Sequence, residues 1–180
     1  VDFVYWMTVN AMGLSVTTFV GQNFGAGKYD RMKKGTMIGL GILAVLTVII
    51  SGGMLLLAHP LLRIFTNDAE VMEITLNMMY FLVPTYLTYI CVEVLSGAVR
   101  GAGDVVAPTL MTCFGVCILR VLWILIAVPL HRTVVMVEWS YPITWTITSL
   151  MYLIYYFHGG WLKRCKEKQA KTFQPTEEHA

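Results

Sequence analysis

Charged side chains are scarce in this sequence: Asp, Glu, Lys and Arg together make up 13% of its 180 residues. A soluble domain usually carries about 25% of these residues, because they form most of its water-facing surface. Hydrophobic residues make up 57% of the chain, and the mean hydropathy is positive. The shortage of charge therefore argues against a water-soluble domain and favours a chain whose surface faces lipid.

The usual sequence signs of a catalytic, metal or nucleotide site are missing as well. The four cysteines form no CxxC pair and are interpreted as small apolar residues, although Cys165 follows the last apolar run, where acylation is an option. The four histidines are too scattered for a metal site, and GAGKYD lacks the GxxxxGK[ST] spacing of a phosphate-binding loop. We therefore expect no enzyme activity, no metal, no cofactor and no nucleic-acid partner.

Five apolar stretches are long enough to cross a bilayer, which takes about 20 residues for ~30 Å of hydrocarbon. They cover residues 3–24, 36–57, 71–99, 107–130 and 134–157. The second stretch has no ionisable residue and so lacks the polar stripe of a soluble helix, while Pro84 should bend the third. The sequence predicts an all-α, polytopic integral membrane bundle over residues 1–161. A polar, basic tail over residues 162–180 is expected to be poorly ordered.

Lysine and arginine sort to alternate loops, in agreement with the positive-inside tendency. Ten of them follow the first, third or fifth stretch, namely Lys28, Arg31, Lys33, Lys34, Arg100, Lys163, Arg164, Lys166, Lys168 and Lys171. The other two loops contain only Arg63 and Arg132 beside acidic residues. We therefore expect a multi-pass protein of the plasma membrane with a cytoplasmic C-terminus.

Two Gly-Ala-Gly triplets lie at the expected cytoplasmic ends of the first and third stretches. The phrase GQNFGAGKYDRMKKG begins at Gly21, and the phrase SGAVRGAGDVVAPTL begins at Ser96. Glycine can take a positive φ that closes a helix C-terminus, and it lets membrane helices approach closely. These structural roles account for the glycines when each is taken alone.

In combination, the two phrases are more specific. The first resembles the GQN-GAG-R signature that follows the eighth helix of MATE (multidrug and toxic compound extrusion) exporters. The second resembles their RGAGD-P turn between helices ten and eleven, and the run Tyr141–Trp145 is similar to part of their last helix. The family-motif residues are Gly21, Gln22, Asn23, Gly25, Gly27, Arg100, Gly101, Gly103 and Asp104.

The resemblance implies a protein of twelve helices in two six-helix lobes, of which this chain would supply helices eight to twelve. The chain opens with Val1 in an apolar stretch, so we expect a C-terminal part whose partners are membrane lipid and the N-terminal lobe of the same protein. The implied function is secondary antiport, in which entry of Na⁺ or H⁺ drives export of cationic or amphipathic drugs. The alternatives are a lipid-linked saccharide flippase of related fold and a non-transporting membrane subunit.

Glu93 and Arg120 are the candidate cation-coupling residues. Glu93 lies inside the third stretch, seven residues before Arg100 and hence ~10 Å from the helix end. An ionised carboxylate alone in hydrocarbon is costly, so Glu93 must face the bundle or a wet cavity, for cation coupling or for a structural ion pair. Arg120 lies too deep in the fourth stretch to reach the interface. One hypothesis is a Glu93–Arg120 pair, and the other is a purely structural tie between helices.

Polar and aromatic residues of the first and third stretches are candidates for a cavity that binds organic cations. They are Asn10, Thr17, Asn77, Tyr80 and Tyr86. Tyrosine faces offer cation–π contact, and the eleven methionines suit a pocket that accepts variable shapes. The alternative is that these side chains only hydrogen-bond between packed helices.

Overall fold

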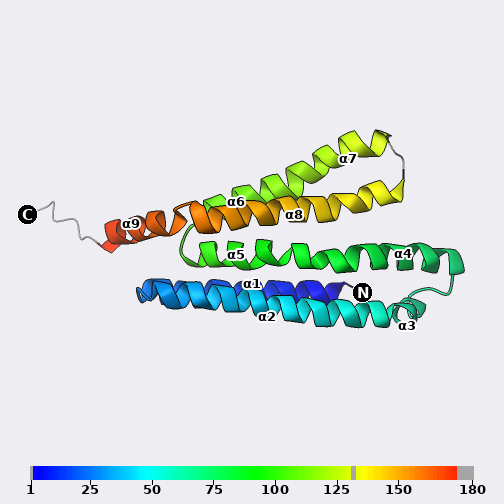
Figure 1. Ribbon diagram of the computed structural model, residues 1–180, viewed down its shortest axis with the longest axis horizontal. Coiled ribbons are helices and arrows are strands. Elements are labelled where there is room, and N and C mark those ends of the chain that lie inside the picture. Colours follow the sequence, from blue (N-terminus) through cyan, green and yellow to red (C-terminus); the bar gives the residue numbers. More distant parts are fainter. Residues whose placement is uncertain (1, 131–132, 174–180) are drawn as a thin grey trace, which may run out of the picture.

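The computed structural model describes residues 2–130 and 133–173, and over these ranges the regular structure is helical (Figure 1). The first half consists of α1 (Phe3–Gly25), α2 (Tyr29–Leu56), the short α3 (Ala58–Arg63), α4 (Ala69–Thr85), the 3-10 turn η1 (Tyr86–Thr88) and α5 (Ile90–Gly101). The second half consists of α6 (Val106–Thr112), the π-helical turn η2 (Cys113–Ile118), α7 (Leu119–Leu130), α8 (Val134–His158) and α9 (Trp161–Phe173). The predicted all-α class is confirmed.

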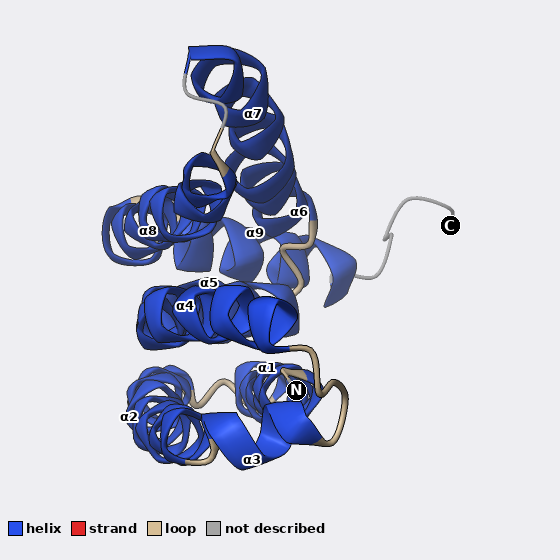
Figure 2. Ribbon diagram, turned by 90° about the vertical axis from the view of Figure 1, so that its right-hand side faces the viewer, coloured by secondary structure: helices blue, strands red, loops and turns tan. Residues whose placement is uncertain are grey.

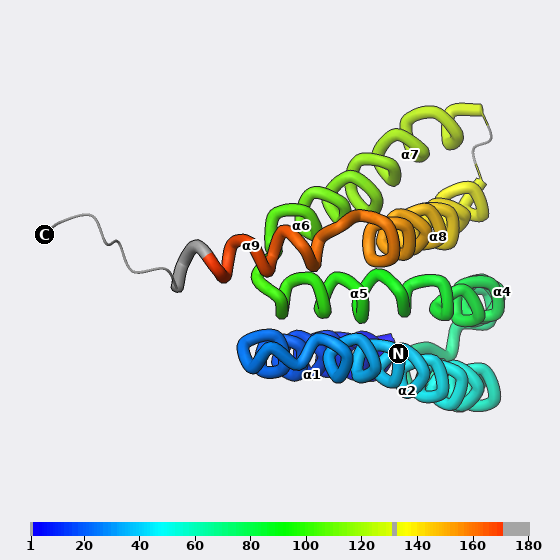
Figure 3. Tube along the Cα trace, turned by 60° about the vertical axis from the view of Figure 1, so that its left-hand side comes forward, coloured from blue at the N-terminus to red at the C-terminus, as the bar shows by residue number. Residues whose placement is uncertain are grey.

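The helices stack in successive layers (Figure 2). The antiparallel pair α1 and α2 forms one layer, the continuous rod α4–α5 lies on it, and α8 packs on that rod. The rod α6–α7 packs on the far side of α8 and diverges from α4–α5 along its length (Figures 1 and 3). Thus α5 is the central helix, since it contacts α1, α2 and α8.

In the described part of the chain, four helical rods are long and apolar enough to cross a membrane. They are Phe3–Gly25, Tyr29–Leu56, Ala69–Gly101 and Val106–Leu130, which agree with the first four expected stretches. The fifth, α8, has 25 residues but is not among them. Its hydroxyl side chains lower the hydropathy, and several are buried within the bundle: Ser140, Thr144, Thr148 and Ser149. Its crossing of the membrane stays a prediction.

Two of the long rods contain a turn whose backbone departs from the regular α-helix. Pro84 has no backbone N–H to donate, and the 3-10 turn η1 follows it within two residues. In the other rod, η2 brings Gly115 against α8, where an added Cβ would collide with the side chain of Thr148. The first interruption gives the irregularity that Pro84 predicts, and it positions Tyr86 at the middle of the bundle.

The loops 26–28, 102–105 and 159–160 lie at one end of the bundle, together with α9 (Figure 1). We call it the basic end, because the lysines and arginines that follow the first, third and fifth stretches lie there. Arg63 lies at the opposite end, and Arg132 lies outside the described residues. The predicted grouping of basic residues is therefore confirmed in space, whereas the side of the membrane that this end faces stays a prediction.

The C-terminal tail is more regular than expected, since α9 extends to Phe173. Trp161 and Cys165 lie four residues apart and are both buried, and the Trp161 indole N–H donates to the Tyr156 carbonyl at 2.9 Å. The prediction of poor order is therefore wrong for residues 162–173, while residues 174–180 lie outside the described ranges. Burial also raises the pKa of the Cys165 thiol, which disfavours the acylation considered for it.

Candidate functional site

Small residues allow α1 and α5 to pack backbone against backbone. Gly13, Thr17 and Gly21 recur every four residues in α1, and they face Gly97 and Gly101 of α5. A Cβ on Gly97 would lie 2.8 Å from the Gly13 carbonyl oxygen, and one on Gly101 would collide with the Thr17 carbonyl. The Thr17 hydroxyl lies 2.8 Å from the Gly13 carbonyl and 3.0 Å from that of Gly97. Thr17, a cavity candidate, is therefore part of the helix contact.

Glu93 extends the same stripe by one turn, four residues before Gly97. Its carboxylate covers Gly13 so closely that a Cβ there would collide with it. The side chain is 13% exposed, and its Oε1 lies 3.8 Å from Nη2 of Arg100, whose side chain is 41% exposed. The Glu93 backbone N–H donates to the Tyr89 carbonyl at 3.4 Å. Glu93 thus faces the bundle as predicted, in a space that exists because residue 13 is glycine.

The hypothesis of a Glu93–Arg120 pair is wrong, since Glu93 pairs with Arg100. Arg120 lies on α7, and α8 packs between α7 and α5. Its Nη2 donates to the Thr144 hydroxyl at 3.3 Å, and its guanidinium lies 4.2 Å from the centre of the Tyr141 ring. Arg120 therefore ties α7 to α8, as the structural hypothesis expected.

An aromatic cluster joins α1, the α4–α5 rod and α8. Its members are Tyr5, Trp6, Tyr86, Tyr89, Tyr141 and Trp145. Tyr5 and Tyr86 stack with ring centroids 4.2 Å apart, and the Trp145 ring lies 5.9 Å from Trp6. Arg120 contacts this cluster through Tyr141, and the Glu93 backbone N–H donates to the carbonyl of Tyr89, a member of the cluster. The two candidate residues thus flank one aromatic cluster without touching each other.

The structure does not bring the remaining cavity candidates together. Tyr86 is buried and lines a cavity of about 520 Å³ between α1 and α4, beside Trp6, Met78 and Met79. Asn77 and Tyr80 are exposed on α4. Asn10 is exposed on α1, and its side-chain N–H donates to the Trp6 carbonyl at 2.8 Å. A binding role for the exposed three stays a prediction.

The two Gly-Ala-Gly triplets close their helices in the same way. Gly27 has φ 69° and Gly103 has φ 92°, the left-handed region expected of a C-terminal glycine. The residue after each glycine donates its N–H to a carbonyl five residues back: Lys28 to Asn23 at 2.8 Å, and Asp104 to Val99 at 3.2 Å. The predicted helix-closing role is confirmed at both positions.

The other family-motif residues divide between packing and surface. The Gly21 backbone approaches α5 so closely that a Cβ on it would lie 3.2 Å from the Gly101 carbonyl. Asn23 is buried, and its side-chain N–H donates to the Phe19 carbonyl at 2.7 Å. Gln22 and Gly25 are exposed at the basic end. Nothing in the structure explains why these two positions need their particular residues.

Asp104 ties three elements together at the basic end. One carboxylate oxygen accepts the Ala107 N–H at 3.4 Å at the start of α6, and the other accepts the Tyr155 hydroxyl of α8 at 2.7 Å. That tyrosine oxygen in turn accepts a bond of 2.8 Å from Arg164 of α9. Asp104 is buried, so the charged member of the family motif acts in this structure as a structural clamp.

We expect Asp104→Ala to lower the free energy of unfolding by about 2 kcal/mol, because it leaves the Tyr155 hydroxyl and the start of α6 without their buried acceptor. Tyr155→Phe removes one of the two bonds and should cost about half as much. The measurement is thermal unfolding of the full-length protein in detergent. Glu73→Ala, which removes an exposed carboxylate of α4, is the control, and an equal loss there would argue against the clamp.

Comparisons with known proteins agree with these motifs. The MatE family model matches residues 1–126. The chain is 24% identical over 163 residues to "Probable multidrug resistance protein YoeA" of Bacillus subtilis, covering 88% of this chain and 34% of that protein. It is 24% identical over 170 residues to "Probable multidrug resistance protein NorM" of Thermotoga maritima, covering 91% and 36%. A NorM of Bacillus cereus is 26% identical over 107 residues, covering 59% and 24%.

The chain thus spans about a third of the length of the first two relatives. The apolar helices and these relatives together indicate a multi-pass membrane protein. The family match covers both Gly-Ala-Gly phrases, the Glu93 position and most of the bundle. The chain belongs to the MatE family.

Proposed function

We propose that the whole protein is a secondary antiporter that exports cationic or amphipathic organic compounds, driven by entry of Na⁺ or H⁺. The observation that carries the proposal is Glu93, a carboxylate held between α1 and α5 inside a spanning rod. A charged group there is costly unless it is used or paired. The relatives' names, which refer to multidrug resistance, support the substrate class.

In this proposal Glu93 exchanges Arg100 for the coupling cation. At 3.8 Å the two groups form an ion pair without a short hydrogen bond, and Arg100 can turn to water at the basic end. Binding of H⁺ or Na⁺ would neutralise the carboxylate and release Arg100. Because Glu93 lies on the α1–α5 contact, neutralising its carboxylate would alter how α1 packs against α5. Rocking of the two lobes would then open the site to the other side of the membrane.

The proposed substrate surface is the cavity of about 520 Å³ between α1 and α4. Trp6 and Tyr86 offer aromatic faces to a cation, and Met78 and Met79 adapt to varied apolar shapes. We place the exposed Asn10, Asn77 and Tyr80 on the surface that meets the first lobe. We also propose that the basic end faces the cytoplasm of a plasma-membrane protein.

The test is transport of a fluorescent organic cation by the full-length protein in vesicles with imposed Na⁺ or H⁺ gradients. We expect efflux that one gradient drives and that stops when an ionophore collapses this gradient. A lipid-linked saccharide flippase would leave the dye unmoved but translocate its lipid, and a non-transporting subunit would do neither. The present segment alone should not transport, because it supplies only one side of the proposed cavity.

A further inference from the structure

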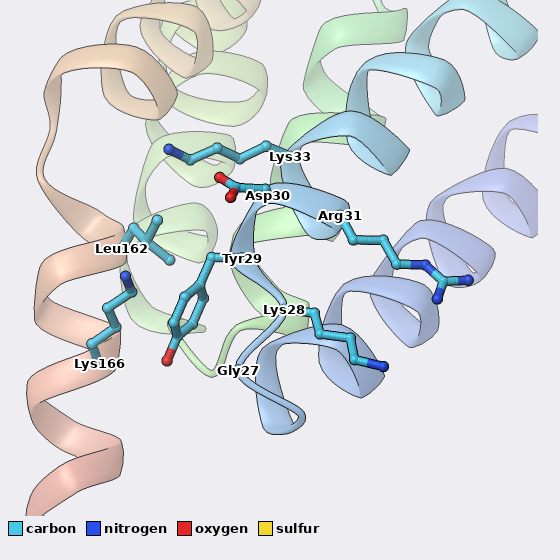
Figure 4. Close-up of a pocket in the computed structure, with 8 residues that line it drawn as sticks. All are labelled: Gly27, Lys28, Tyr29, Asp30, Arg31, Lys33, Leu162 and Lys166. Atoms are coloured by element: carbon cyan, nitrogen blue, oxygen red, sulfur yellow. The ribbon is translucent and has the colours of Figure 1, made fainter.

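A groove separates α2 from the α8–α9 junction at the basic end. Its larger part is a cavity of about 540 Å³ (Figure 4), lined by Gly27, Lys28, Tyr29, Asp30, Arg31, Lys33, Leu162 and Lys166. An adjoining cavity of about 300 Å³ is lined by Lys33, Tyr156, Phe157, Gly160, Trp161 and Leu162. Lys33 and Leu162 line both cavities. The two cavities therefore form one groove with a basic half and an aromatic half.

The cations of the groove come from both of its walls. Lys33 projects from α2 and Lys166 from α9, whereas Lys28 and Arg31 point away from α9 (Figure 4). The Lys166 ammonium lies 3.6 Å from the centre of the Tyr29 ring, a cation–π contact that holds it at the groove. Asp30 is the one carboxylate among the described lining residues. The basic half of the groove therefore favours an anion.

The groove also lies at the depth where lipid headgroups are expected. The apolar run of α2 begins near Thr36, so Lys33 lies ~5 Å beyond it. On the other wall, Phe157 is 61% exposed near the end of α8, whereas Trp161, which also lines the groove, is buried. Tryptophan and tyrosine favour this interface between hydrocarbon and headgroups. The aromatic half therefore adjoins the hydrocarbon, and the basic half adjoins water.

We propose that this groove binds an acidic phospholipid, with its phosphate between Lys33 and Lys166 and its acyl chain against Phe157 and Leu162. Basic pockets between membrane helices at the cytoplasmic side suit anionic headgroups. A free phosphate ion would use the basic half alone and leave the aromatic half without a role. The bound lipid links α9 to α2 across the groove.

The test compares binding of phosphatidylglycerol, phosphatidylcholine and inorganic phosphate to the full-length protein in detergent, by native mass spectrometry of lipid titrations. Each lysine near an anionic lipid contributes a factor of about five, so Lys33→Gln with Lys166→Gln should weaken phosphatidylglycerol binding about 30-fold. The matched control is Lys34→Gln with Lys163→Gln. It removes the same charge from the same two helices, but neither residue lines either cavity. Lys33→Arg with Lys166→Arg should retain binding.

Three results would overturn the proposal. Equal weakening in the control pair would mean that the general charge of the basic end attracts the lipid. Equal affinity for phosphatidylcholine would mean that the lysines do not select the headgroup. Full competition by equimolar inorganic phosphate would identify an anion site without a lipid. Unfolding temperatures of all variants are measured alongside. If the glutamine pair does not fold, Lys33→Gln and Lys166→Gln are compared singly with Lys34→Gln, and each should weaken binding about five-fold while Lys34→Gln does not.

Discussion

Glu93→Gln is expected to reduce gradient-driven efflux by the full-length protein to the level of vesicles without protein, while leaving the fold intact. Glutamine has nearly the same shape and fits the space over Gly13, but it cannot carry a charge or take up a coupling proton. Arg100 loses its partner at little cost, because its side chain is 41% exposed. The measurement is the initial rate of dye efflux under each imposed gradient.

Glu73→Gln is the matched control, since this carboxylate is exposed on α4. It should transport at the wild-type rate. The thermal unfolding temperature of both variants is measured to separate loss of coupling from loss of fold. A folded Glu93→Gln protein that still couples efflux to the gradient would show that the coupling carboxylate lies elsewhere in the full protein.

Gly101→Ala is expected to lower the free energy of unfolding by about 3 kcal/mol, the upper range for an overpacked contact. The added methyl group would collide with the Thr17 carbonyl, a backbone atom that cannot rotate away. The helices α1 and α5 would have to separate along the stripe that also positions Glu93. The measurement is the unfolding temperature and the monodisperse yield of the full-length protein in detergent.

Gly41→Ala in α2 is the control for helix propensity, since a Cβ there meets nothing within 4 Å. Alanine favours a helix over glycine by up to about 1 kcal/mol, so this variant should be as stable as the wild type or more so. If both substitutions lower stability equally, the cost comes from the loss of glycine itself, and close approach of α1 and α5 is not the cause.

The sequence predicted most of the bundle, because an apolar run of bilayer length or a basic loop can be recognised from consecutive residues alone. The positive φ of Gly27 and Gly103 was likewise predictable, because each glycine lies where its apolar helix is expected to end. Helix α9 was not predicted, because the many charged residues of this segment are typical of a polar tail. The signal was present, since Trp161 and Cys165 are one turn apart and bury the same face.

The candidate site was predictable only in part. The energetic cost of a charge in hydrocarbon correctly placed Glu93 toward the bundle. Its partner could not be chosen from the sequence, because Arg100 and Arg120 are both suitable cations there. Only the packing of α8 between α5 and α7 separates Glu93 from Arg120. The four-residue spacing of Gly13, Thr17 and Gly21, and of Gly97 and Gly101, is typical of close helix contact, but it was not among the predictions, and Thr17 was assigned to a cavity instead.

The aromatic cluster lay beyond sequence reasoning for a different reason. Tyr5, Tyr86 and Trp145 come from three segments that are far apart along the chain. Aromatic residues are common in membrane helices both as interface anchors and as packing, so their types alone do not show which of them meet. Only the layering of α1, the α4–α5 rod and α8 brings them together.

The central claim, that five membrane crossings place the basic loops on the cytoplasmic side, is tested most directly by cysteine labelling in intact cells. In a full-length protein without its native cysteines, Lys28→Cys and Lys163→Cys should react with an impermeant thiol reagent only after permeabilisation. Asn67→Cys, in the loop between α3 and α4, should react without it. Labelling of positions 28 and 163 from opposite faces would show that α8 or another rod does not cross, and it would contradict the account.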